Sequence, residues 1–79
     1  MSQYRLIAPT REGLYLSIDA AALAMLWATK DDPKVTCMPY IDCADGSPLT
    51  TTENDLIDAF MDRVDYDDLP TCPAAESTP

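Results

Sequence analysis

The start of the chain contains two short runs of mainly hydrophobic residues, separated by turn residues, which is typical of β-strands. Residues 4–8 (Tyr-Arg-Leu-Ile-Ala) predict a first strand that ends before Pro9. Residues 9–13 contain proline and glycine and predict a turn, and residues 14–16 (Leu-Tyr-Leu) predict a second short strand. We therefore expect a hairpin, with residues 14–16 as the lead-in to a helix as the alternative.

A second β region is expected in the middle of the chain. Residues 34–42 are rich in β-formers, although Pro39 interrupts them and indicates an edge, a bulge or a kink. The dipeptide Asp45-Gly46 that follows is typical of a hairpin turn. Residues 47–50 would then form a short fourth strand, which Pro48 weakens.

Between these two β regions the sequence predicts an unusually apolar helix. Ser17 or Asp19 would cap its start, and Pro33 would end it, because the residue before a proline avoids helical geometry. Residues 20–28 are apolar on nearly every side, so this helix requires burial on several sides. Either the strands and a second helix supply that cover, or a homodimer through residues 19–29 or another partner does.

The second half of the chain predicts an amphipathic helix from Thr52 to Asp68. At 100° per residue, four of its seven acids lie within a sector of roughly 80°. These acids are Asp55, Asp58, Asp62 and Asp65. The apolar residues on the opposite side form the expected core face: Leu56, Ile57, Phe60, Met61 and Val64.

Two registers compete for the start of this second helix. Thr52 with Asp55 resembles a capping box, and Thr50 with Glu53 fits that pattern better. At the other end, late acids oppose the negative end of the helix dipole, where a sequence tuned for stability would carry lysine. We interpret those late acids as support for a functional acid cluster: Asp65, Asp67 and Asp68.

Together these elements predict one small α+β domain over residues 1–68. Its expected order is β-β-α-β-β-α, with a short antiparallel sheet packed with two helices. A chain of 79 residues allows one domain. Residues 69–79 contain three prolines, small residues and one charge, and they predict a disordered tail.

The charge balance restricts the kinds of partner. The net charge is −9, from 14 acidic and five basic residues, so like charges disfavour direct binding to nucleic acid or to an anionic membrane. A basic protein partner, or solubility alone, suits this charge. The longest apolar run, residues 20–28, is far shorter than the ~20 residues of a membrane span. With no signal segment and an odd number of cysteines, we expect a cytoplasmic protein with free thiols.

Catalytic and metal-binding chemistry find little support. The chain has no histidine, which removes the usual general base of hydrolases. Cys37 and Cys43 have Lys34 as their nearest cation in sequence, and small neutral strand residues are the favoured interpretation of both. Three scattered cysteines do not form a zinc set, and two glycines provide no phosphate loop. We therefore predict a non-enzymatic protein without a metal or cofactor.

The acids of the second helix are the candidate binding residues. A row of carboxylates on a helix resembles a phosphate backbone, although acids on an exposed helical face are also ordinary solvation. Affinity would also need an aromatic anchor, for which Tyr66 is the first candidate and Tyr40 the second. The predicted partner-binding set is Asp55, Asp58, Asp62, Asp65, Tyr66, Asp67 and Asp68.

In its small size, acidity and carboxylate-faced helix, the whole chain resembles the phage-type inhibitors known as anti-CRISPR proteins, and DNA-mimic proteins in general. No motif carries this resemblance. It implies a protein partner with a Lys/Arg-rich nucleic-acid groove, such as a CRISPR effector complex, whose target DNA is blocked by charge mimicry. Two alternatives remain: an acidic immunity or antitoxin protein that neutralises a basic toxin, and a small homo-oligomeric assembly protein.

Overall fold

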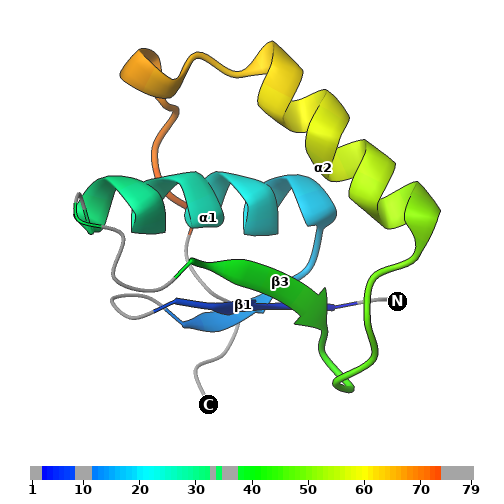
Figure 1. The fold of residues 1–79 in the computed structure, drawn as a ribbon. Coiled ribbons are helices and arrows are strands. Elements are labelled where there is room, and N and C mark those ends of the chain that lie inside the picture. Colours follow the sequence, from blue (N-terminus) through cyan, green and yellow to red (C-terminus); the bar gives the residue numbers. More distant parts are fainter. Residues whose placement is uncertain (1–2, 9–11, 33, 35–37, 74–79) are drawn as a thin grey trace.

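The computed structural model describes residues 3–8, 12–32, 34 and 38–73. Its elements, in chain order, are β1 (Tyr4–Ile7), β2 (Gly13–Tyr15), α1 (Ile18–Asp31), β3 (Tyr40–Cys43), α2 (Thr51–Arg63) and the 3-10 helix η1 (Tyr66–Asp68). The strands form one antiparallel sheet in the order β2-β1-β3 (Figure 1). The predicted α+β fold, with a short antiparallel sheet and two helices, is confirmed.

Helix α1 lies between the sheet and α2. It contacts all three strands on one side, and α2 packs on its other side (Figure 1). The alanines of the predicted homodimer face are buried within the single chain: Ala21, Ala22, Ala24 and Ala28. Their small side chains allow close approach to neighbouring elements, so the apolar helix is covered from two sides without a second copy.

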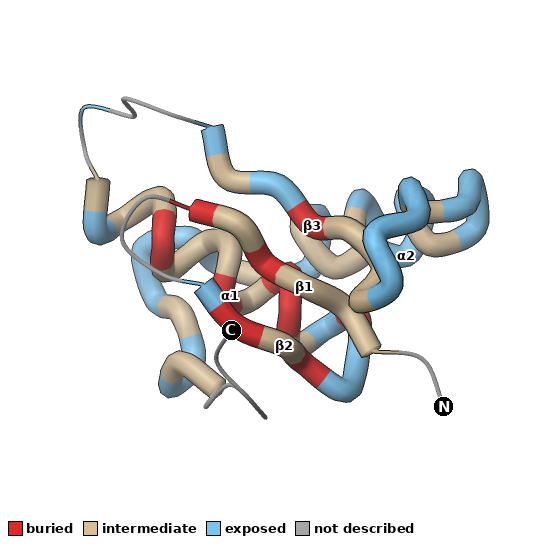
Figure 2. Tube along the Cα trace, turned by 90° about the horizontal axis from the view of Figure 1, so that it is seen from below, coloured by how far each residue is buried: buried red, intermediate tan, exposed pale blue. Residues whose placement is uncertain are grey.

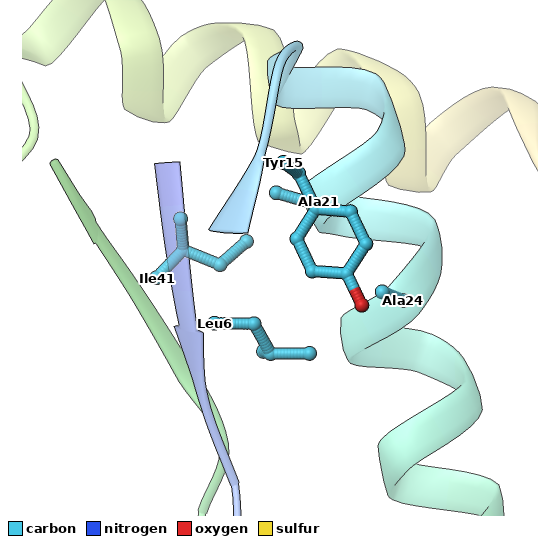
Figure 3. Packing of buried hydrophobic residues seen from close by; sticks show 5 residues of the cluster. All are labelled: Leu6, Tyr15, Ala21, Ala24 and Ile41. Atoms are coloured by element: carbon cyan, nitrogen blue, oxygen red, sulfur yellow. The ribbon is translucent and has the colours of Figure 1, made fainter. Parts of the chain in front are cut away.

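The core is the contact between the sheet and α1. Leu6, Tyr15 and Ile41, one from each strand, lie against α1 (Figure 3). Because successive side chains on a strand point to opposite faces, the residues paired with Leu6 share its inner face. Those residues are Gly13 on β2 and Ile41 on β3. Figure 2 shows how this burial concentrates where the strands meet α1.

The predicted fourth strand, residues 47–50, does not form. The chain does turn at Gly46, whose φ is +92°, a conformation that glycine adopts without strain. After the turn, the Cys43 N–H donates to the Ser47 carbonyl at 3.1 Å. Pro48 then has no N–H to donate, and Thr50 serves instead as the N-cap of α2. The predicted third strand is also shorter than expected: it begins at Tyr40, directly after Pro39, and residues 35–37 lie outside the described part.

Of the two caps that the sequence allows for helix α1, the structure has Ser17, and Asp19 lies in the first turn. Ser17 is its N-cap, and the Ala20 N–H donates to the Ser17 hydroxyl at 3.1 Å. The helix ends at Asp31, with Asp32 as its C-cap. Within the described ranges, no helix has the length and apolar character needed to cross a membrane.

The chain beyond α2 turns toward α1 and passes across it (Figure 1). The described part of the predicted tail, residues 69–73, has no regular secondary structure. It is nevertheless tied to the domain, because the Trp27 indole N–H donates to the Pro70 carbonyl at 2.9 Å. Residues 74–79 of the predicted tail lie outside the described residues.

Candidate acidic interface

Three of the predicted acids form a row along α2. Asp55, Asp58 and Asp62 are all exposed. With a rise of 1.5 Å per residue, they follow one another at about 4.5 Å and about 6 Å along the helix axis. In the part of the chain that the structure describes, none of the three forms a salt bridge. Their charge is therefore available to solvent or to a partner.

The start of α2 is held by a capping box. The Glu53 N–H donates to the Thr50 hydroxyl at 3.1 Å, and the Thr50 N–H donates to the Glu53 carboxylate at 2.9 Å. The Thr50–Glu53 register is thus confirmed, and the competing register of Thr52 with Asp55 is wrong. As a result, Asp55 takes no part in the cap and belongs to the exposed row.

Glu53 has a structural role that links α2 to the sheet. Hydrogen bonds from the Thr50 backbone and from the Tyr4 side chain lower the pKa of the Glu53 carboxyl below its ordinary value of 4.5. The Cys43 thiol lies 4.0 Å from the same carboxylate. One ionised side chain therefore connects the first turn of α2 with β1 and β3, and it orients the helix that carries the acidic row.

The predicted helix over residues 52–68 is too long. α2 ends at Arg63, and the next residue, Val64, has extended backbone angles. Asp65 instead caps η1, because its carboxylate accepts the Asp67 N–H at 3.0 Å. The late acids Asp65, Asp67 and Asp68 are exposed, but they lie beyond α2 and not on its last turn. They carry their negative charge on a separate element, η1.

The two tyrosines proposed as anchors lie on different sides of the molecule. Tyr66, in η1, is 42% exposed, and the Lys30 Nζ lies 4.9 Å from its ring centre. Tyr40, the first residue of β3, pairs with Ile7 and lies on the sheet face opposite α1. Tyr66 is therefore close to the acids of η1, whereas the sheet and α1 separate Tyr40 from the acidic row.

Arg63, the cation of α2, pairs with α1 and not with the acidic row. Arg63 pairs with Asp19 of α1 at 3.9 Å, and its guanidinium lies 5.9 Å from the Phe60 ring centre. Both members of this ion pair are exposed, so it contributes little to stability, on the order of 0.2–1 kcal/mol. The pair nonetheless positions the Arg63 charge toward α1.

Cys43 lacks the environment of a reactive thiol. Partial desolvation, followed by the nearby carboxylates of Glu53, Asp45 and Asp42, raises the pKa of the Cys43 thiol. A thiol with a raised pKa is a poor nucleophile at neutral pH. Cys37 lies outside the described residues. Among the residues that are described, no group of three or more acids and cysteines could hold a metal ion.

One residue of this surface was assigned to the wrong environment by the sequence. Leu56 was expected on the core face of the second helix, but it is 49% exposed. The sequence did contain a sign of this exposure: Leu56 lies at the edge of the apolar sector, about 100° around the helix axis from both Asp55 and Ile57. The sequence does not show how far α1 reaches around α2, and that reach decides whether Leu56 is covered.

The fold and the surface together define a small α+β domain with an acidic helical face. No protein-family model, no curated protein and no solved structure matches the chain.

Proposed function

We propose that this protein is a non-enzymatic inhibitor, similar in action to anti-CRISPR proteins, that binds the basic nucleic-acid groove of a host defence complex in the cytoplasm. It blocks target DNA by presenting negative charge in place of the phosphate backbone. The observation that carries this proposal is the exposed row of Asp55, Asp58 and Asp62 on a capped helix. The net charge of −9 supports it.

The spacing of the row suits a groove lined with lysine and arginine. Phosphates of one DNA strand follow at ~3.4 Å along the axis, which is shorter than the steps of about 4.5 and about 6 Å between these carboxylates, so the match is loose. Long cationic side chains adapt to that difference. Each exposed contact is weak, but several together steer association and raise the on-rate.

The test is a pull-down of the tagged protein from host lysate at low and at high salt, with mass spectrometry of the retained proteins. We expect a nucleic-acid-handling complex that is lost at high salt. The double variant Asp58→Lys with Asp62→Lys should no longer retain it. A control with the same change in charge, Glu12→Lys with Asp31→Lys, alters exposed acids outside α2 and should still retain it.

Each other outcome would contradict the proposal. Equal loss in both double variants would show that net charge matters and the row does not. Retention of one small basic protein would favour an immunity or antitoxin function. Retention of no protein, or of further copies of the chain alone, would leave the acids as an ordinary solvated face.

A further inference from the structure

Helix α2 keeps part of its apolar surface exposed. Whereas α1 has five buried residues, α2 has none. Ile57 packs against the core and is itself only partly buried. The apolar face of α2 is therefore incompletely covered in the free protein. Short helices take most of their stability from packing of that face, so further cover would stabilise α2.

The uncovered part of this face lies beside the acidic row. Leu56 is 49% exposed, Ala59 is exposed and Phe60 is half-buried. Residues three and four apart on a helix are neighbours, so these three side chains form one stripe. We call Leu56, Ala59 and Phe60 the apolar stripe of α2. Asp55 borders it, because Asp55 lies about 40° from Ala59 around the helix axis.

We infer that the apolar stripe of α2 is the anchor of the interface and occupies an apolar recess at the edge of a groove lined with lysine and arginine on the partner. This inference rests on the proposed function. The acidic row steers the encounter with a basic surface, but exposed charge pairs add little affinity. A buried apolar contact supplies the affinity that the row lacks and slows dissociation.

Charge complementarity identifies the occupant as a basic protein. Two copies of the chain that met through this stripe would bring together two molecules of net charge −9, with an Asp55 carboxylate at the border of each stripe. Arg63 lies beside Phe60, but its charge is already paired with Asp19 of α1. Like charges that face each other across an interface oppose association. A partner with lysine or arginine around the recess would bury the apolar stripe and pair with the acids.

The test is Leu56→Asp, which removes the anchor and adds an acid. If charge mimicry alone determined binding, this variant would bind the complex captured by the wild-type protein as tightly or more tightly. We expect at least about a tenfold loss of affinity, the size of effect that removal of one buried apolar contact produces. The matched control is Leu16→Asp, because Leu16 is 47% exposed and precedes α1.

Folding of the variants and self-association of the wild type are measured separately from binding. Circular dichroism and thermal melting should show that both aspartate variants fold, and Leu56→Met, which keeps an apolar side chain, should bind within about twofold of the wild type. Wild-type affinity in Leu56→Asp, or equal losses in Leu56→Asp and Leu16→Asp, would overturn the inference. So would a wild-type dimer that Leu56→Asp dissociates in sedimentation. If the wild type captures no complex, the proposed function fails first.

Discussion

The Lys30 ammonium, in the last turn of α1, lies 4.9 Å from the centre of the Tyr66 ring in η1. The same ammonium lies 5.9 Å from the Trp27 ring centre. This contact joins the end of α1 to the segment that follows α2. It accounts for the position of the late acids, because η1 is held near α1 and does not continue the axis of α2.

The Lys30–Tyr66 contact should be measurable as a coupling energy. In a double-mutant cycle of Lys30→Gln and Tyr66→Ala, we expect a coupling of about 0.5–1 kcal/mol in the free energy of unfolding, typical of an exposed cation–π pair. Urea denaturation of the four proteins gives this value. Additive losses from the two substitutions would show that the contact contributes nothing.

The capping box predicts different effects for two neighbouring threonines. Thr50→Ala removes the acceptor of the Glu53 N–H and should lower the free energy of unfolding by about 1 kcal/mol. Thr52→Ala is the control, because Thr52 is exposed and does not cap the helix, and its effect should stay within about 0.5 kcal/mol. Chemical denaturation compares the two, and a larger loss in Thr52→Ala would contradict the observed register.

Glu53 predicts a stability that depends on pH on the acid side. Its pKa in the folded protein lies below the ordinary value of 4.5, so the folded state favours the ionised carboxylate. The stabilisation is present above about pH 4.5 and is lost as the pH falls through the lower folded pKa. Glu53→Gln should therefore be less stable than the wild type at neutral pH, and the difference should shrink in acid. Denaturant unfolding across this range is the measurement, and a difference that stays constant with pH would contradict it.

The close packing of α1 on the sheet predicts that Ala24 does not tolerate a larger side chain. Ala24 is fully buried against the strands, so Ala24→Leu should cost about 1–3 kcal/mol through overpacking. Ala59→Leu makes the same change at an exposed helical position and should alter stability by less than about 0.5 kcal/mol. Thermal melting of both variants tests this difference, and equal melting temperatures would show that α1 has room to move away from the sheet.

Much of the candidate site could be predicted from helical periodicity. The spacing of Asp55, Asp58 and Asp62 places them on one side of any helix that contains them, whatever it packs against. The predicted length of that helix is wrong, because the position of its end depends on residues far away in the sequence. The chain after Arg63 takes an extended conformation and reaches Lys30 and Trp27 of α1.

Local chemistry in the sequence by itself determined where the two helices begin and where the chain turns before α2. Ser17 and Thr50 cap their helices through side chains three residues from the amides they bind, and Asp45-Gly46 forms its turn with near neighbours. Only the tertiary structure decided which surfaces remain exposed. The sheet and α2 bury the alanines of α1, but α1 leaves Leu56 uncovered, because burial depends on how far a distant neighbour extends.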